Sequence, residues 1–255
     1  MLLLLLLLSF FMTTESCKNL DVRRAISYRL IKANAQSKQD VMTRRRVASV
    51  SKCMDFAENK NALAFYFERT VSNEANCLLL RCPESVGIPQ LMNVTGVDYY
   101  SAYPNNRRAE NLSVICVENV GLFTIFPDRL NFTEARDSCR KIHGSLADVS
   151  NEARSRGLAS MVNESIAYVG LSNEGNQRLW KNEFGDLLSC HDYRAWDSGE
   201  PSHSRGCVGL IQADYKNDPV WRVVPCATKL PYICELPKFR SFTNHKRVGN
   251  FMWGR

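Results

Sequence analysis

The feature of this sequence that most restricts its fold is a set of ten cysteines in 255 residues. They are Cys17, Cys53, Cys77, Cys82, Cys116, Cys139, Cys190, Cys207, Cys226 and Cys234. An even number of cysteines in an exported chain is typical of a disulfide framework. If the chain is exported, we therefore expect it to fold around disulfide bonds.

The first sixteen residues predict that export. The apolar run from Leu2 to Phe11 is too short to span a bilayer. Thr14 and Ser16 place small residues where signal peptidase cleaves. We expect residues 1–16 to be a signal peptide; a short signal anchor is the alternative, because no basic residue precedes the run. No later segment approaches the roughly 18 apolar residues of a transmembrane helix, so we expect a secreted, extracellular protein.

Four sequons for N-linked glycosylation agree with this route. They begin at Asn93, Asn111, Asn131 and Asn163. The pattern Asn-X-Ser/Thr marks exposed loops of secreted glycoproteins. We therefore expect a disulfide-bonded glycoprotein.

The net charge of +7 is unevenly distributed along the chain. Residues 17–104 carry 13 Lys and Arg against 8 Asp and Glu, whereas residues 117–235 carry 13 against 16. Residues 236–255 add five basic residues and no acidic one. In a secreted protein, basic regions of this kind favour anionic glycans, acidic proteins or membrane surfaces as partners over nucleic acid.

Composition divides the mature chain into two modules. The segment YPNNRRAENLS at 103–113 is polar and contains a proline, so we read it as an exposed linker. The predicted parts are a first module at 17–104, a linker at 105–116, a second module at 117–237 and a basic tail at 238–255.

Hydrophobic patterns predict an α+β second module. Residues 121–130 are expected to form a strand and residues 131–144 a helix, with Asn131 and Glu134 as a capping box and Gly144 at its end. A second helix is expected from Ser150 toward Val162. Its predicted buried residues are Ala153, Leu158, Met161 and Val162. The predicted later strands are 167–171, 207–211 and 230–235, separated by a long irregular region that suits a binding loop.

Ordered motifs in this module resemble the C-type lectin-like domain. They are FTEARDSCRKIHGSLADVSNEA from residue 132, YVGLSNEGNQRLW from 168, W-x2-GEP at 196–201, CVGL at 207, W-x4-C at 221–226 and PYICE at 231. The resemblance implies two helices, two small antiparallel sheets and a long loop. It also implies the disulfides Cys139–Cys234 and Cys207–Cys226.

In the sugar-binding members of that family, carboxylate and amide oxygens hold a calcium ion, and the sugar hydroxyls complete its coordination shell. Here Glu200 keeps the first ligand position, but Ser202 replaces an amide and Arg205 an acid. Arg222 and Val223 stand where the family has Asn-Asp. We therefore expect no calcium at this primary site and no other cofactor.

Several alternatives stay open for this loop. A shifted alignment would use Asn217 and Asp218 as calcium ligands. Secondary calcium sites of the fold would use loop acids such as Asp186, Asp192 or Asp197. The candidate ligand-binding residues are Glu200, Ser202, Arg205 and Arg222. Arg205 and Arg222 would form a point that binds an anionic ligand, or they would form a salt bridge to Glu200.

The first module is similar to MANSC and PAN modules in its order of elements. A short helix at 47–60 carries Cys53, and the strand AFYFE is followed by NCLLLRC. The resemblance implies a small α+β module with a helix on a sheet, and the disulfides Cys53–Cys77 and Cys17–Cys82. An unclassified disulfide-bonded domain is the alternative.

These pairings leave Cys116 and Cys190 over. They could pair with each other, with the first module or with another chain, and a bond through Cys190 would give a disulfide-linked dimer.

No catalytic signature is present, since the chain lacks HExxH, GxSxG and a glycine-rich phosphate loop. The expected function is a non-enzymatic adhesion or extracellular-matrix protein whose lectin-like domain binds a protein or glycan without calcium. One alternative is a receptor for anionic polysaccharides that uses the basic first module, including TRRRV at 43–47, and the tail. The other is a retained calcium-dependent lectin.

Overall fold

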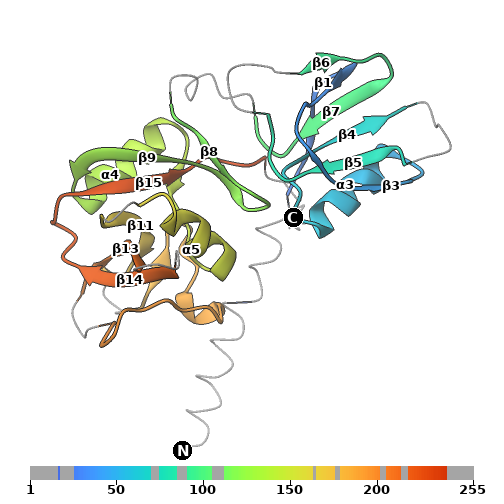
Figure 1. Cartoon of the computed structure of the whole chain (residues 1–255). Coiled ribbons are helices and arrows are strands. Elements are labelled where there is room, and N and C mark those ends of the chain that lie inside the picture. The colour runs from blue at the N-terminus through green and yellow to red at the C-terminus, as the bar shows by residue number, and fades with distance from the viewer. Residues whose placement is uncertain are drawn as a thin grey trace, which may run out of the picture.

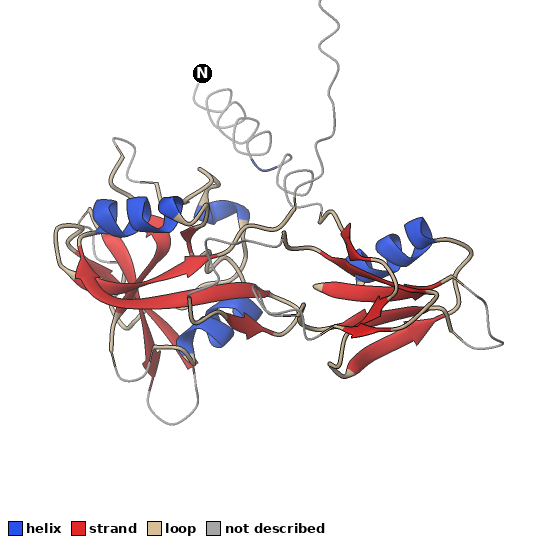
Figure 2. Cartoon of the chain, turned by 90° about the horizontal axis from the view of Figure 1, so that it is seen from above, coloured by secondary structure: helices blue, strands red, loops and turns tan. Residues whose placement is uncertain are grey.

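The computed structural model describes residue 17 and residues 26–69, 75–84, 91–104, 112–162, 165–175, 179–201, 205–213 and 218–239. The expected signal peptide, the tail beyond residue 239 and the sequons at Asn111 and Asn163 lie outside the described residues. Within the described part, no helix is both long and apolar enough to cross a membrane. Two bodies built on separate sheets lie side by side (Figures 1 and 2).

The first body is a five-stranded antiparallel sheet of order β1-β7-β4-β5-β3 (Figure 1). Its strands are β1 (Arg29–Lys32), β3 (Val41–Arg45), β4 (Ala64–Glu68), β5 (Cys77–Leu80) and β7 (Val97–Ser101). The short strands β2 (Ala35–Gln36) and β6 (Met92–Asn93) pair with each other.

One helix, α3 (Val50–Asn59), packs on this sheet. It begins at Ser49, whose hydroxyl accepts a hydrogen bond from the Lys52 amide, as expected of an N-cap residue. Cys53 and Ala57 lie one turn apart on its buried face. The helix expected over 47–60 is therefore present, and it is shorter by its first turn.

The second body is an eight-stranded sheet, whose main path runs β14-β13-β11-β15-β9-β8. These strands are β8 (Ile115–Val117), β9 (Gly121–Leu130), β11 (Ala167–Ser172), β13 (Cys207–Ala213), β14 (Asp218–Val224) and β15 (Leu230–Glu235). Two short strands extend it, β10 (Ser145–Leu146) on β15 and β12 (Lys181–Asn182) on β11. The two small sheets that the family resemblance implied are joined into one, because β11 pairs with both β13 and β15.

Two helices cover opposite faces of this sheet. Helix α4 (Phe132–Lys141) shares a buried cluster with Tyr168, and helix α5 (Glu152–Ala159) shares another with Val169. Neighbouring strand residues point to opposite faces, so the two clusters lie on the two sides of the sheet. A short 3-10 helix, η2 (Leu188–Cys190), lies in the long loop.

The capping box predicted at the start of α4 is confirmed. Asn131 accepts from the Glu134 amide at 2.9 Å, and the Glu134 carboxylate accepts from the Asn131 amide at 3.1 Å. At the other end, His143 rather than Gly144 takes the left-handed conformation, with φ 62°. Gly144 is required for a different reason: a Cβ there would lie 2.5 Å from the Glu235 carbonyl oxygen.

The second helix differs from its prediction. It starts at Glu152 with Asn151 as its N-cap, and Ala153 is exposed. Ser155 is buried instead, together with Leu158 and Ala159. A serine can face the core here because its hydroxyl donates to the Val149 carbonyl oxygen at 3.1 Å.

The polar segment after the first module ends earlier than expected. Strand β8 pairs with β9 at Ile115, Cys116 and Val117, so the last residues assigned to the linker belong to the second sheet. Residues 105–111 lie outside the described part.

All ten cysteines form disulfides. Three pairs match the expectation: Cys53–Cys77, Cys139–Cys234 and Cys207–Cys226. The expected pair Cys17–Cys82 is wrong, because Cys17 bonds to Cys190 and Cys82 to Cys116. A dimer linked through Cys190 is excluded with them, since its sulfur is already bonded within the chain.

The two bodies are joined by a shared core and by residues 236–239, which we call the connector. Leu122 and Leu236 pack in the same buried cluster as Leu63 and Tyr103 of the first body. The Leu236 amide donates to Leu122, and the Phe239 amide donates to Ala102 at 2.7 Å. The start of the predicted basic tail is therefore part of the folded structure.

Candidate ligand-binding site

The loop singled out in the sequence lies between Trp196 and β13. Gly199 adopts φ 79°, a conformation that glycine takes without steric cost, and the Glu200–Pro201 peptide is cis. The Glu200 amide donates to the Asp197 carbonyl oxygen at 3.0 Å. Glu200 is half-buried, whereas Ser202 falls outside the described residues. The loop is thus shaped by its own backbone turn up to Pro201.

Arg222 of β14 forms an ion pair with Asp197 beside this loop. Its guanidinium donates through Nε at 3.0 Å and through a terminal nitrogen at 2.6 Å to Oδ2 of Asp197. These bonds, with one from the Ser198 amide, lower the pKa of Asp197 below its usual range. The salt bridge expected between Arg222 and Glu200 is therefore wrong, because Asp197 is the partner. Asp197 is held there by its own amide, which donates to the Trp221 carbonyl oxygen.

Arg205 does not join Arg222 in this ion pair. It precedes β13, and the ladder pairs Cys207 with Val224 and Gly209 with Arg222, so Arg205 lies beyond the end of the ladder. It is exposed and has no ion-pair partner among the described residues.

Asp218, the ligand of the shifted alignment, stands at the far end of β14 from the loop. Its carboxylate pairs with Arg156 of α5 at 2.8 Å. Four residues of extended chain separate it from Arg222, about 13 Å. Asp218 is therefore removed from Glu200 and Asp197, while Asn217 lies outside the described residues.

Aromatic side chains support the loop from below. Trp221 is fully buried and packs edge-on against Trp196 and Tyr193, and Trp196 in turn contacts Trp180. The backbone bridge between Trp196 and Trp221 places Asp197 beside β14, next to Arg222. Trp221 and Trp196 directly precede Arg222 and Asp197 in the sequence, so their packing fixes the backbone positions of this ion pair.

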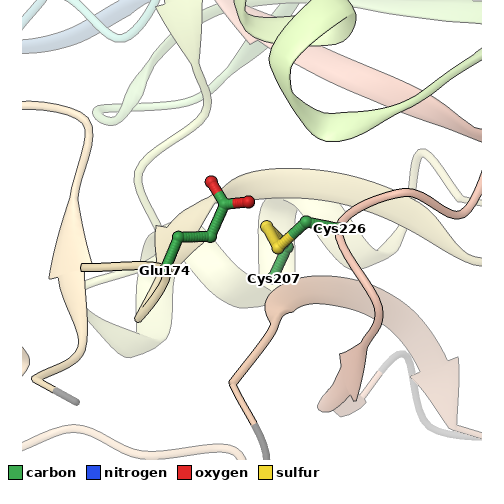
Figure 3. Close-up of side chains that lie close together, drawn as sticks. All are labelled: Glu174, Cys207 and Cys226. Carbon is green, nitrogen blue, oxygen red and sulfur yellow. A yellow bond between two sulfur atoms is a disulfide. The ribbon is translucent and has the colours of Figure 1, made fainter. Parts of the chain in front are cut away.

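Two disulfides restrain the same region. Cys207–Cys226 closes the end of the long loop, and Cys17–Cys190 ties its middle to the N-terminal part of the chain. Glu174 lies beside Cys207–Cys226 (Figure 3). Within the described residues this is the one group of three metal-ligand residue types, but sulfurs bonded to each other offer no thiolate to a metal.

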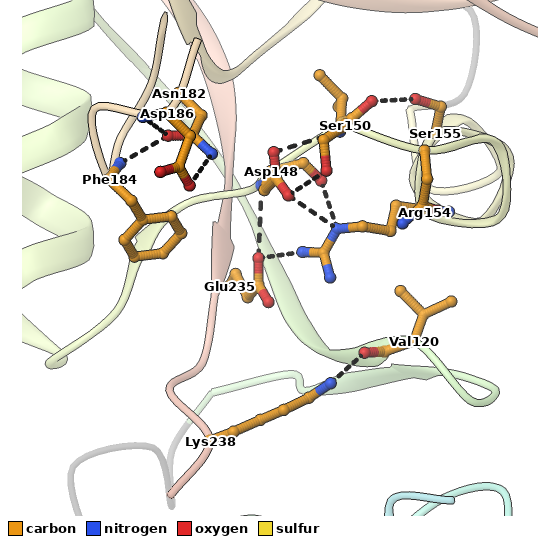
Figure 4. A network of polar contacts seen from close by, with 12 residues as sticks. Val120, Asp148, Ser150, Arg154, Ser155, Asn182, Phe184, Asp186, Glu235 and Lys238 are labelled. Atoms are coloured by element: carbon orange, nitrogen blue, oxygen red, sulfur yellow. Dashed lines mark hydrogen bonds and ion pairs between the residues drawn. The ribbon is translucent and has the colours of Figure 1, made fainter. Parts of the chain in front are cut away.

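A second cluster of charges lies where β15 meets the connector (Figure 4). Arg154 of α5 pairs with Asp148 at 3.5 Å and also with Glu235, and all three side chains are at most 14% exposed. Lys238 donates to the Val120 carbonyl oxygen at 2.8 Å, and burial lowers its pKa to about 8. The sequence analysis did not predict any of these residues as part of a site. The signal that could have indicated them is the acid within each of the apolar segments LADVS and PYICE, Asp148 and Glu235.

A cavity of about 660 Å³ opens beside this cluster. Asn119, His143 and Lys238 line it together with the rings of Phe184 and Phe239. The charges of Arg154, Asp148 and Glu235 already satisfy one another, so the cluster fastens α5 to β15.

Two of the three acids of the alternative secondary calcium sites are engaged, and the third, Asp192, is exposed. Asp186 accepts from the Asn182 side chain and donates its amide to it, while Asp197 is bonded to Arg222. In the described part of the chain, no three carboxylates converge on one point.

Comparisons with known proteins agree with this architecture. A family model for the Lectin C-type domain matches residues 128–236. The C-type lectin lectoxin-Enh5 of Pseudoferania polylepis is 30% identical over 122 residues, which are 44% of this chain and 73% of that protein. A C-type lectin mannose-binding isoform of Notechis scutatus scutatus is 29% identical over 124 residues, 44% of this chain and 75% of that one.

Among solved structures, human lithostathine at 1.3 Å resolution matches with a TM-score of 0.40 and 26% identity, covering 45% of this chain and 82% of that chain. By the family model and the Pseudoferania relative, the α+β body with its bracing disulfides has a C-type lectin-like fold. The chain belongs to the C-type lectin family. Domains of this family are generally non-enzymatic binding modules, and this protein is a binding protein of that class; the family model does not extend to residues 26–104.

Proposed function

We propose that this protein is a secreted, non-enzymatic adhesion or matrix protein whose lectin domain binds a protein or glycan without calcium. The observation that carries the proposal is the Arg222–Asp197 ion pair, with a nitrogen–oxygen distance of 2.6 Å. A calcium site needs six to eight oxygen ligands, and here a guanidinium occupies the place beside the loop acid. The residues present do not fit the ion.

Other features support the extracellular part of the proposal. Five disulfides suit an oxidising compartment, and the first residues read as a signal peptide. Asn93 is exposed on β6, where its side-chain oxygen accepts from the Lys32 amine and its amide nitrogen stays available, and Asn131 keeps its amide nitrogen free of the capping box. We propose glycans at these two sequons, and a MANSC- or PAN-like identity for the first body because a helix lies on its sheet.

The test is a glycan array probed with the full mature protein in calcium and again in EDTA. Calcium-independent binding predicts the same bound set and the same intensities in both conditions. In a parallel thermal unfolding experiment, millimolar calcium should leave the melting temperature unchanged, since an ion that does not bind the native state does not stabilise it. Binding abolished by EDTA, or a melting temperature raised by calcium, would show that a calcium-dependent site is retained.

A designed variant makes the test sharper. Arg222→Asn with Val223→Asp removes the guanidinium and adds two oxygen-bearing side chains, so this variant should respond more to calcium than the native chain does. Arg156→Asn is the matched control, because Arg156 is also half-exposed and also paired with an acid. An unchanged calcium response in both variants would mean that Arg222 is not what excludes the ion.

A further inference from the structure

The first body carries an unusual run of charge at the edge of its sheet. Strand β3 is the last strand of the order β1-β7-β4-β5-β3, so its outer side has no neighbouring strand among the described residues (Figure 1). Its end holds Arg44 and Arg45, and Arg46 follows directly. All three side chains are exposed. We call these three residues the arginine edge.

The strand register places Arg44 and Arg45 on opposite faces of the sheet. Arg44 stands opposite Leu78, which belongs to the apolar cluster on the face away from α3. Arg45 stands opposite Cys77 on the helix side, where its guanidinium lies 5.4 Å from the centre of the Phe56 ring. The arginine edge therefore presents positive charge around the rim of the sheet instead of on one flat face.

The three arginines form no ion pair within the described part of the chain. Other arginines are paired: Arg69 with Asp98, Arg81 with Glu118, Arg154 with Glu235, Arg156 with Asp218 and Arg222 with Asp197. None of Arg44, Arg45 and Arg46 has a carboxylate within 4.0 Å among the described residues. An unpaired guanidinium keeps its five donors for a ligand.

The backbone that carries the arginine edge is held firmly. Directly after it, the Asn76 side chain accepts from the Val47 amide at 2.8 Å and donates to the Val47 carbonyl oxygen at 3.0 Å. The chain then enters α3 at Ser49, and the first turn of that helix contains no acidic residue. The positive end of the helix dipole thus adds to the charge of the arginines and does not oppose it.

We propose that the arginine edge binds a sulfated glycosaminoglycan. Guanidinium groups form two parallel hydrogen bonds with the oxygens of a sulfate, and a linear polyanion can follow a rim that is charged on both sides. A membrane surface fits less well, because interfacial binding combines basic residues with apolar side chains that insert. Among the residues that the structure describes, the exposed large apolar side chains are Leu30, Met92, Ile115, Leu179 and Phe184, none of them on β3 or α3.

The experiment is heparin affinity chromatography of the full mature protein in a sodium chloride gradient. The native chain should elute above physiological salt. The triple variant Arg44→Gln, Arg45→Gln and Arg46→Gln should elute at lower salt and bind soluble heparin at least about ten-fold more weakly. The slope of log affinity against log salt should fall by about 2 to 3, because each contacted sulfate releases about one counterion.

Matched variants separate the site from charge in general. Replacing Arg129, Lys181 and Lys229 by glutamine removes the same charge from exposed positions of the lectin body, and it should change heparin affinity less than two-fold. Deleting residues 240–255 measures the contribution of the tail. Replacing the three edge arginines by lysine keeps the charge but removes the paired donors, so this variant should bind heparin more tightly than the glutamine variant and more weakly than the native chain.

Several outcomes would overturn the proposal. They are elution of the native chain below physiological salt, an equal loss in the glutamine control, loss confined to the tail deletion, or tighter binding to phosphatidylserine vesicles than to heparin. An unchanged near-ultraviolet circular dichroism spectrum verifies that the variants fold. Heparin elution of the edge variants and the calcium response of the lectin domain are separate measurements, so this proposal can fail or hold independently of calcium-independent binding by the lectin domain.

Discussion

At the residue scale, Arg154 is the least exposed cation among the ion pairs of the described residues. Its guanidinium lies between Asp148 and Glu235 and also donates to the Asp148 carbonyl oxygen at 2.8 Å (Figure 4). Each of the two carboxylates is less than 15% exposed. Removing the cation would leave two neighbouring acids in a poorly hydrated place, which costs far more than losing an exposed pair.

We therefore expect Arg154→Met to lower the free energy of unfolding by about 3 to 5 kcal/mol. Chemical denaturation of the oxidised protein near neutral pH measures this loss. Arg156→Met, two residues further along α5, is the control: Arg156 is 51% exposed, so solvent screens its ion pairs and the loss of stability should be much smaller than that of Arg154→Met. Equal losses in the two variants would contradict the role given to Arg154.

At the element scale, α4 shows how a short sequence pattern determines a helix boundary. Asn131 and Glu134 satisfy each other's amides, and Phe132, Ala135 and Cys139 form the buried face. The disulfide Cys139–Cys234 then fastens this face to β15. Because Asn131 also begins a sequon, its structural role must be separated from glycosylation.

Asn131→Ala should cost about 1 kcal/mol of unfolding free energy, because the Glu134 amide loses its acceptor. The comparison uses protein produced without glycans and a denaturant titration. Thr133→Ala removes the sequon but keeps the cap, so its stability should equal that of the native chain. If both variants were equally destabilised, the capping box would not be the cause.

At the scale of the whole molecule, the connector makes the two bodies one unit. Leu236 fills a cluster that contains residues of both bodies, and Phe239 bonds to Ala102 and to Ser27. Lys238 lies between Leu236 and Phe239 in the connector. Its amine donates to the Val120 carbonyl oxygen and lies 6.0 Å from the centre of the Tyr103 ring. Its depressed pKa links the stability of this junction to pH.

Burial lowers the pKa of Lys238 from 10.5 to about 8, so the unfolded chain binds this proton more tightly than the folded chain. The stability that follows is fully present above pH 10.5 and is lost as the pH falls through about 8. As the pH rises from 8 to 10.5, the free energy of unfolding of the native chain should increase relative to that of Lys238→Met, by at most about 1.4 kcal/mol per pH unit. Denaturation curves at a series of pH values measure the difference. The exposed Lys229→Met control should run parallel to the native chain, and a parallel curve for Lys238→Met would refute the linkage.

Local patterns predicted a large part of this structure. The capping box at Asn131, strands β9, β11, β13 and β15, and helix α3 were all predicted from spacing within one element, where side chains a few residues apart must face one way. The lectin fold was predicted from motifs that span the whole second body. The second helix was misplaced because a buried serine with a backbone partner carries no hydrophobic signal.

The sequence by itself determined the fold of the second body, and it supplied Arg222 and Val223, the residues on which the proposal of calcium-independent binding rests. Only the tertiary structure decided which cysteines are bonded to each other and which charged side chains form ion pairs. It paired Cys17 with Cys190 across 173 residues, joined Arg222 to Asp197 instead of Glu200, and buried Arg154 between two acids. The physical reason is that ion pairs and disulfides depend on distances set by sheet register and by the packing of the two bodies, and sequence separation does not contain those distances.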